Sequence, residues 1–266
     1  MMLQNSYSLR VITASVKDVN VSLEREFLKI IHHIYSCKIF KNILDIVATK
    51  CSLNQLTFRL QNAKFFDIDA GNCITMVDDL GYADSSQKRK KYIITIKKLA
   101  SDVIMHEIGH MLEHELSHIL NMQRFSSMLM YEVNNAPIHM KSIVKSLFVD
   151  QLKGYPESQH ISELFARFFQ FFAGANEVAY QTSLNAQYRL QEAILIFQNT
   201  LAFLDSELAN KWSYLVDEKI SSDSQKFQNN HMPQEVWADR KVKTFSTGTS
   251  TSDRWKVKSN KADPFK

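Results

Sequence analysis

Segments in which apolar residues recur every three or four positions run through most of this chain, and they constrain its fold more than any other feature. Such spacing places the apolar side chains on one face of an α-helix. The longest of these segments runs from Val21 to Thr49 and is interpreted as scaffold. Further helices are predicted at Ile138 to Leu152, Ser158 to Ala173, Leu184 to Leu204 and Ser206 to Ile220. With only 6 Gly and 4 Pro in 266 residues, the chain has few of the turns that an all-β sandwich needs.

Short β-rich runs follow the first long helix. They are Leu56 to Leu60, Phe65 to Asp69, Cys73 to Val77 and Tyr92 to Ile96. Residues 70–72 between the second and third runs are typical of a hairpin turn, and a polar loop separates the last two. We therefore expect an α+β fold that is mainly helical. A small, mostly antiparallel sheet should pack beside the helix that follows the last run.

That next helix is predicted from Ser101 to about Asn121, and its first two residues supply an N-cap and an acidic first turn. Its apolar residues form one broad arc: Ile104, Ile108, Met111, Leu112, Leu116 and Ile119. His106 and His110 lie roughly opposite this arc, so they should face a cleft while the helix rests on the core. Glu115 falls inside the apolar arc and does not fit this arrangement.

His106 and His110 have the spacing of two metal ligands on a helix. Four residues separate them by about 40° in angle and about 6 Å in height, so their rings can converge on one ion. Glu107, about 100° round from His106, can reach a metal-bound water without binding the metal itself. The alternative is a helix whose histidines are ordinary solvated residues, since His114 and His118 continue the same four-residue steps.

A third ligand must come from elsewhere in the chain, because Leu116 stands where the third histidine of a metzincin pattern would be. The best candidate is Glu163, on a predicted helix where Ala166, one turn away, leaves room for a close helix approach. A carboxylate would complete a His2Glu set with one open position, as catalytic zinc requires. Two alternatives remain: Glu163 pairs with Arg167 on the surface, or His160 is the ligand.

The two segments HEIGHMLEHEL and YPESQHISELFARFF resemble the gluzincin metallopeptidases, in particular the catalytic domain of anthrax lethal factor and related bacterial toxins. In that group a second helix of the form E-x-F-A-x-x-F supplies the glutamate ligand, and a tyrosine shortly before it assists the oxyanion. The residues that match the helix pattern here are Glu163, Phe165, Ala166 and Phe169. Tyr155 matches the tyrosine, although an aromatic residue in such a turn also packs, and His160 is the alternative for its role. The resemblance covers about Tyr92 to Phe172 and implies a zincin-like architecture, which we assign to residues 1–220.

Motif and resemblance together predict a zinc-dependent endopeptidase with one Zn2+ per chain. His106, His110 and Glu163 would hold the ion, while Glu107 takes a proton from the zinc-bound water and passes it to the leaving amine. Tyr155 would stabilise the oxyanion. The expected substrate is a protein or peptide, and the resemblance implies a bacterial toxin or effector that acts on host proteins.

The strand Tyr92 to Ile96, just before the motif helix, is predicted to be an edge strand that pairs with an extended substrate. The alternative is an internal strand, because its residues are apolar enough to be buried on both faces. A different class of function also remains open. In that reading the chain is a non-catalytic helical interaction protein whose metal site is degenerate or structural.

Apolar periodicity stops near Ser221, so residues 221–266 are predicted to be a mobile, basic tail that serves as a recognition or export signal. Arg240 to Lys266 carries eight Lys/Arg and two Asp. No nucleic-acid motif or aromatic stacking platform accompanies this charge, so nucleic acid is not an expected partner. The sequence shows no secretory signal and no run near the roughly 18 apolar residues of a membrane span. We expect a soluble protein, either cytoplasmic or exported by a route other than a Sec signal.

Overall fold

The computed structural model describes residues 7–17, 21–61, 70–77, 90–184 and 186–207. Clustering of the chain separates a first unit, residues 1–227, from residues 228–266, and none of the latter is among the described residues. Every described helix and strand belongs to the first unit. The predicted strand Phe65 to Asp69, most of the predicted helix Ser206 to Ile220 and the predicted tail lie outside the described residues.

Two helices occupy the segment that was predicted to be a single long one. They are α2 (Val21–Ser36) and α3 (Lys38–Ser52), and the break falls at Cys37, whose backbone is extended (φ −83°, ψ 120°). The apolar periodicity runs through the break because both helices bury a face against the same core, including Phe27 and Leu44. A short helix that was not predicted, α1 (Tyr7–Ala14), precedes them.

The sheet is mixed, whereas a mostly antiparallel one was predicted. Its strands are β1 (Val16–Lys17), β2 (Leu56–Leu60), β3 (Gly71–Val77) and β4 (Lys90–Ile96), in the order β1-β2-β4-β3. The pairs β1–β2 and β2–β4 are parallel, and only β3–β4 is antiparallel. The helices α2 and α3 form the crossover that a parallel β1–β2 pair requires. Because β2 pairs with β4, β3 is displaced to the edge.

The strand β4 is therefore internal, and its prediction as an edge strand was wrong. It lies between β2 and β3, and the side chains of Tyr92, Ile94 and Ile96 are buried. The alternative, an internal strand, is confirmed. The apolar character of this strand had pointed to burial on both faces.

The motif helix α4 (Ser101–Leu116) ends earlier than predicted. Ile119, assigned to its apolar arc, lies beyond its end and is exposed, and a further helix that was not predicted, α5 (Met122–Asn134), follows. Glu115, the polar residue inside the arc, accepts a hydrogen bond from the Tyr92 hydroxyl at 2.5 Å and pairs with Lys50 Nζ at 2.5 Å. A polar residue is tolerated there because both contacts offset the burial of its carboxylate.

The remaining elements are also helical. They are α6 (Ile138–Lys145), a π-helical turn η2 (Ser146–Asp150), two 3-10 turns η3 (Gln151–Gly154) and η4 (Glu157–Gln159), and the helices α7 (His160–Ala173), α8 (Leu190–Ile196) and α9 (Gln198–Glu207). The predicted helix Ile138 to Leu152 thus changes its helical type twice, and the one predicted from Leu184 begins at Leu190. Among the helices described, none combines the length and apolar character that crossing a membrane requires.

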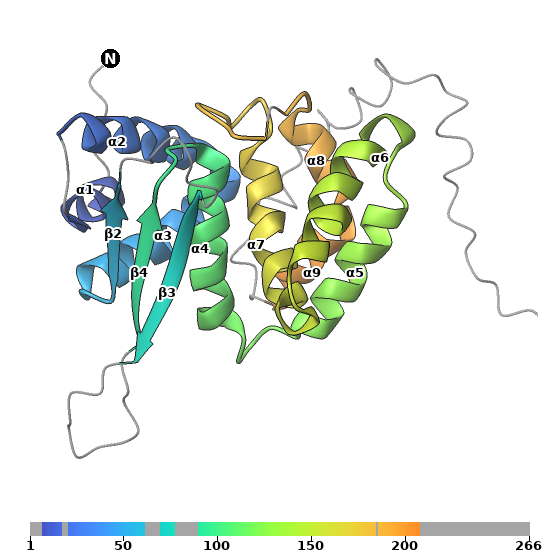
Figure 1. Ribbon diagram of the computed structural model, residues 1–266, viewed down its shortest axis with the longest axis horizontal. Helices are drawn as coiled ribbons and strands as arrows, with labels where there is room; N and C mark the ends of the chain where they lie inside the picture. The colour runs from blue at the N-terminus through green and yellow to red at the C-terminus, as the bar shows by residue number, and fades with distance from the viewer. Residues whose placement is uncertain (1–6, 18–20, 62–69, 78–89, 185, 208–266) are drawn as a thin grey trace, which may run out of the picture. The chain divides into compact units, whose positions relative to one another are not determined.

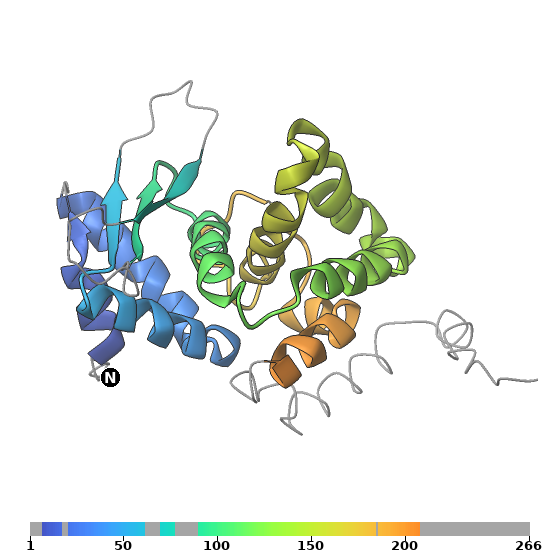
Figure 2. The same cartoon turned by 90° about the horizontal axis from the view of Figure 1, so that it is seen from below.

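The helices α4 and α7 lie side by side in the middle of this unit (Figures 1 and 2). The sheet and α1–α3 flank the pair on one side, and α5, α6, α8 and α9 flank it on the other. The two helices run antiparallel, since Ser101 Oγ at the start of α4 donates to the Ala173 carbonyl at the end of α7 (3.2 Å). The fold is therefore α+β and mainly helical, with the sheet beside the motif helix, as predicted.

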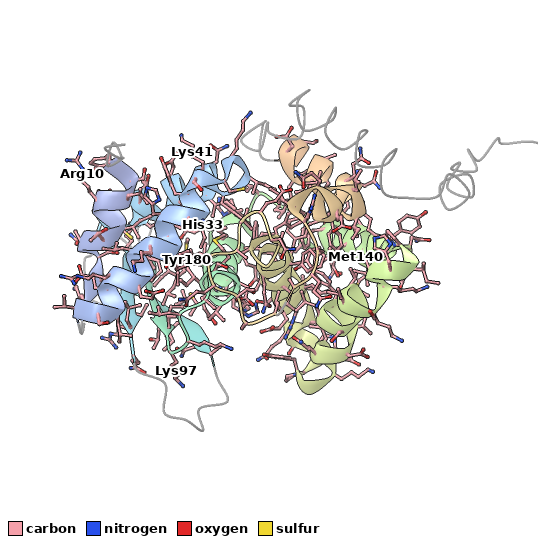
Figure 3. The ribbon with its side chains drawn as sticks, turned by 90° about the horizontal axis from the view of Figure 1, so that it is seen from above. Arg10, His33, Lys41, Lys97, Met140 and Tyr180 are labelled. Atoms are coloured by element: carbon pink, nitrogen blue, oxygen red, sulfur yellow. The ribbon has the colours of Figure 1, made fainter. Side chains whose placement is uncertain are left out.

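The connection between α7 and α8 reaches back to the start of α4. The Ser101 amide donates to the Gln181 carbonyl at 2.7 Å, and the Asp102 carboxylate accepts a bond from the Ser183 amide at 2.9 Å. On α2, the His33 ring lies 6.0 Å from the ring of Tyr180. Both residues are labelled in Figure 3. These contacts hold the first turn of α4, and hence the start of the motif helix, in place.

Candidate metal centre

The three residues predicted to be metal ligands lie together. His106 Nε2 is 3.2 Å from His110 Nε2. Glu163 Oε1 lies 3.5 Å from His110 Nε2, and Glu163 Oε2 lies 3.9 Å from His106 Nε2. Ligand atoms around a tetrahedral zinc, with bonds of about 2.0–2.1 Å, are about 3.3 Å apart. This group can hold a metal ion, and it is the one such group found in the part of the chain that the structure describes.

Close packing of α4 against α7 brings Glu163 to the histidines. Gly109, between the two histidines, faces Ala166, and a Cβ added to Gly109 would lie 2.7 Å from Ala166 Cα. Such an approach requires glycine, since real Cβ atoms do not come that close. The small residue Ala166 had predicted the approach, and Gly109 completes it from the other helix.

Each histidine is oriented through its second ring nitrogen. His106 Nδ1 lies 3.1 Å from Gln170 Oε1, and His110 Nδ1 lies 3.2 Å from Ser162 Oγ. The Ser162 hydroxyl donates its own hydrogen to the Glu113 carboxylate, so its oxygen accepts from His110. Both rings therefore carry a proton on Nδ1, which leaves Nε2 as the atom of each ring that would bind a metal, as in metal-binding histidines.

Burial and mutual contact set the charge of these groups. Burial lowers the pKa of His106 to about 3, so this ring is neutral near pH 7 and its Nε2 is available to a metal. For His110, burial favours a lower pKa, but the nearby Glu163 carboxylate has the larger effect, so the pKa is above its usual value. Burial favours a higher pKa for Glu163, yet His110, His106 and Arg167 together hold it below its usual value. Burial raises the pKa of Glu107 to about 7.

Two carboxylate oxygens of the site are buried without a hydrogen-bond partner among the described residues. They are Oε2 of Glu107 and Oε2 of Glu163, on side chains of residues only 5% and 6% exposed. Buried polar atoms are nearly always paired, because an unpaired one costs free energy. The Glu163 carboxylate lies beside two histidine Nε2 atoms, and its Oε2 accepts no hydrogen bond although Arg167 lies near it. A carboxylate in this position fits a metal ligand, and a donor set of two nitrogens and a carboxylate suits zinc.

A pocket of about 330 Å³ is lined by one of the three predicted ligands, His106. Glu107 and Tyr155, predicted to be catalytic, both line it together with His106. The Arg167 guanidinium lies over the Tyr155 ring, 5.6 Å from its centroid. Burial and, to a smaller extent, the Glu163 charge raise the pKa of the Tyr155 phenol, which therefore keeps its proton near neutral pH. The structure thus brings a carboxylate and a protonated phenol to the same pocket.

The alternatives for the third ligand have different outcomes. His160 Nε2 is 2.9 Å from the Tyr155 carbonyl oxygen, and His160 is not part of the ligand group. Arg167 does pair with Glu163, with Nη2 3.3 Å from Oε2, but both side chains are buried, whereas a surface pair was the alternative. Glu163 therefore faces the histidines and Arg167 at the same time.

Sequence reasoning missed the residues that support the ligands. Gln170 and Ser162 orient the two histidines, and Gly71 of β3 lies beside Glu107. One signal was present: Gln170 is a polar residue inside an aromatic run, two helical turns after Glu163 and on the same face. Ser162 and Gly71 give no such signal, because their roles depend on which other segments lie beside them.

No family model matches this sequence, and no curated protein matches it closely enough to indicate a relationship. The assignment of the site rests on the geometry of its own residues.

Proposed function

We propose that this chain is a zinc-dependent endopeptidase of the gluzincin type, with a zincin-like architecture and one Zn2+ per chain. The observation that carries the proposal is the buried group of His106, His110 and Glu163 with Glu107 and Tyr155 in the adjoining pocket. Two histidines and a glutamate from a second helix leave one position of a tetrahedral ion open for chemistry. The resemblance to lethal factor and related toxins supports substrates among the proteins of a host cell.

The protein groups around this ion have separate roles. When bound, the zinc supplies a Lewis acid that activates water and polarises the scissile carbonyl. Glu107 would accept the proton of the attacking water and deliver it to the leaving amine, a role that its place in the pocket beside His106 allows. Tyr155 donates its phenol hydrogen to the negative charge that develops on the carbonyl oxygen. Gln170 and Ser162 keep the two histidine rings in their ligating orientation.

The edge strand β3 is the proposed partner of the substrate backbone, in place of β4. No strand in the described part of the sheet pairs with the outer edge of β3. Its first residue, Gly71, is so close to the motif helix that an added Cβ would lie 3.2 Å from Glu107 Oε1. An extended peptide that adds to this edge would pass beside the proposed general base.

Metal analysis and hydrolysis measured on the same variants test the proposal. We expect one zinc per chain after supplementation, lost in His110→Ala and in Glu163→Ala. Glu107→Ala should keep the zinc and lose hydrolysis. His118→Ala, which removes an exposed histidine beyond the end of α4, is the matched control and should change neither. A chain that holds no zinc, or a Glu107→Ala variant that hydrolyses normally, contradicts the proposal.

Substrates can be found by comparing new protein N-termini in host-cell lysates treated with the wild type and with Glu107→Ala. Cleavages that depend on Glu107 identify the substrates. Zinc retained without any such cleavage favours the second function, a structural metal in an interaction protein.

A further inference from the structure

Arg167 has more hydrogen-bonding capacity than its neighbours use. Its side chain is only 6% exposed, and its Nη1 donates to Gln151 Oε1. Its Nη2 lies 3.3 Å from Glu163 Oε2, and its Nε has no hydrogen-bond partner among the described residues. A guanidinium carries five N–H donors, and leaving them unpaired in a buried place costs free energy. Arg167 also lines the pocket beside the metal ligands, so a molecule in that pocket can reach it.

The charge of the pocket points to an anion. Without metal, Arg167 offsets Glu163. Once Glu163 holds a divalent cation, the carboxylates nearest that cation and the guanidinium are those of Glu163 and Glu107, since Glu113 bonds to Ser162 and does not line the pocket. One positive charge is then left over even when Glu107 is ionised. A buried surplus charge is costly unless an opposite charge pairs with it.

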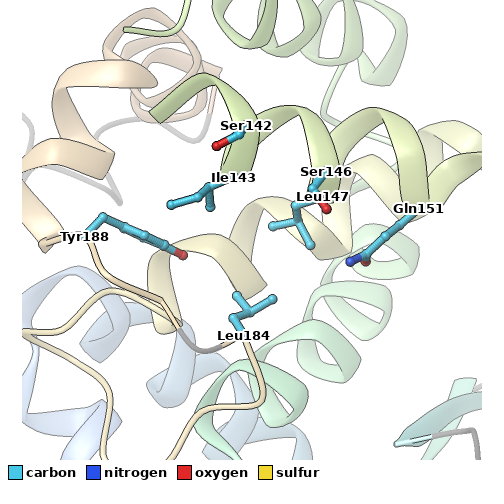
Figure 4. A pocket seen from close by; sticks show the side chains of 7 residues that line it. All are labelled: Ser142, Ile143, Ser146, Leu147, Gln151, Leu184 and Tyr188. Atoms are coloured by element: carbon cyan, nitrogen blue, oxygen red, sulfur yellow. The ribbon is translucent and has the colours of Figure 1, made fainter. Parts of the chain in front are cut away.

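Gln151 lies between the metal-side pocket and a second pocket; we call the part of the pocket formed by Gln151 and Arg167 the Arg167 corner. It accepts from Arg167 and lines the metal-side pocket, and it also lines a second pocket of about 290 Å³ with Leu147, Leu184 and Tyr188. Figure 4 shows the Gln151 amide at one end of that second pocket, pointing toward it. A substrate group at Arg167 can therefore belong to a chain that continues past Gln151 or to one that ends there.

We propose that Arg167, positioned by Gln151, binds a carboxylate of the substrate next to the scissile bond. This inference rests on the proposed peptidase function. The planar fork of a guanidinium matches the two oxygens of a carboxylate, and a carboxylate supplies the missing negative charge. The carboxylate belongs either to an acidic side chain or to the C-terminus of a short peptide.

A positional library of fluorescence-quenched octapeptides, each made with a C-terminal acid and with a C-terminal amide, tests the specificity. The zinc-loaded wild type should cleave peptides with the carboxylate in its preferred place about 10- to 100-fold better than the matched Asn, Gln or amide peptides. Dependence on Asp or Glu identifies a side-chain carboxylate, and dependence on the free acid identifies a C-terminal one. A wild type that cleaves with no carboxylate preference overturns the inference and leaves the peptidase function standing.

Two variants test whether the preference for a substrate carboxylate depends on Arg167 and Gln151. Arg167→Met removes the positive charge and should abolish the preference. Gln151→Glu should abolish it as well, because the new carboxylate would pair with the Arg167 guanidinium in place of the substrate. Gln151 is exposed, so its substitution tests the inference even if Arg167→Met does not fold. Arg25→Met removes an exposed arginine of α2 and should keep the preference. Equal slowing of all peptides in both variants would mean that Arg167 only holds Glu163, and the inference would fail.

A binding measurement separates this inference from the proposed function. Zinc-loaded Glu107→Gln is titrated with the matched acid and amide peptides, and the same titration is repeated with Gln151→Glu added. The acid peptide should bind about 10- to 100-fold more tightly, and the added substitution should remove the difference. If this holds although the wild type cleaves nothing, the carboxylate site stands and the peptidase proposal falls. Equal binding of the acid and amide peptides overturns the carboxylate site.

Discussion

Two helix contacts of this protein bury glutamates in opposite ways. Where α5 meets α9, Glu132 accepts four hydrogen bonds: Oε1 from the Asn199 amide and side chain (2.7 and 3.0 Å), and Oε2 from the Thr200 amide and hydroxyl (3.1 and 2.6 Å). At the metal-side contact, where α4 meets α7, Glu107 and Glu163 each keep a buried oxygen that accepts no hydrogen bond from the described residues. A carboxylate satisfied by its own chain holds helices together. One that is buried and left unsatisfied is available to a metal or a substrate.

The largest difference between the two helix contacts should appear in zinc binding when the buried glutamate of each contact is changed to glutamine. Glu163→Gln should weaken zinc binding about 100- to 1,000-fold, because one of the ion's protein ligands loses its charge. Glu132→Gln should leave zinc binding unchanged but lower the free energy of unfolding by about 2 kcal/mol, since an amide NH2 would face N–H and O–H donors. Zinc titration against a competing chelator and urea unfolding of the zinc-free chain measure the two effects. If both variants lose zinc affinity alike, the contrast between the two contacts is wrong.

The unsatisfied Glu107 should make the zinc-free protein less stable at high pH. Its pKa rises from 4.5 to about 7 on folding, so between these values the folded protein binds a proton that the unfolded chain has lost. Stability therefore falls as pH rises through this window, by up to about 3 kcal/mol. Glu107→Gln should remove that loss and stabilise the zinc-free protein increasingly from pH 4.5 to pH 7.5. Urea unfolding at several pH values measures the difference, and a gain independent of pH would contradict the assignment.

The metal-side contact should depend on close packing at Gly109 as well as on its hydrogen bonds. Gly109→Ala places a methyl group against Ala166 and should cost about 1–3 kcal/mol of stability, with weaker zinc binding as the helices move apart. Gly154→Ala is the control, because no described atom lies within 4 Å of an added Cβ there. Thermal unfolding and zinc titration compare the two variants. If Gly109→Ala is as well tolerated as Gly154→Ala, close packing does not hold this contact together.

The smallest effect is expected from the hydrogen bond that orients His110. Ser162→Ala should weaken zinc binding about tenfold, at the lower end for such supporting groups, because the hydroxyl is neutral. Ser162→Thr keeps a hydroxyl and should restore most of the affinity. Neither change should alter the number of zinc ions bound at saturation. An affinity that is the same in all three proteins would show that the Ser162 contact does not orient the ring.

Local patterns predicted the parts of the site that lie within one helix. The spacing of His106 and His110 and the place of Glu163 one turn from Ala166 follow from helical periodicity, and the structure brings the three predicted ligands together. The strand Leu56 to Leu60 was also predicted with its observed ends, since its β-rich residues are bounded by polar ones. Zinc itself, the catalytic roles and the family resemblance stay predictions.

Features that depend on distant contacts could not be predicted in this way. The break at Cys37 leaves the apolar periodicity intact, so the periodicity gives no sign of it. The parallel pairing of β2 with β4 passes over β3, whereas a hairpin pattern predicts that strands next to each other in the sequence pair. The corner formed by Gln151 and Arg167 depends on η2 and η3, whose π and 3-10 turns rotate the chain out of α-helical register. Helical periodicity assumes one constant rotation per residue and fails there.

The close approach of β3 to α4 also decides how much change the site tolerates. A Cβ at Gly71 would lie 2.8 Å from the Thr95 carbonyl oxygen and 3.2 Å from Glu107 Oε1. The strand backbone would have to shift to admit it. Gly71 thus carries no functional group, yet one added methyl would displace the entrance to the pocket with every ligand and proton donor still present. If the proposed peptidase activity is found, Gly71→Ala should therefore lose it while keeping every predicted ligand and proton donor, and such a variant would suit the capture of intact substrates.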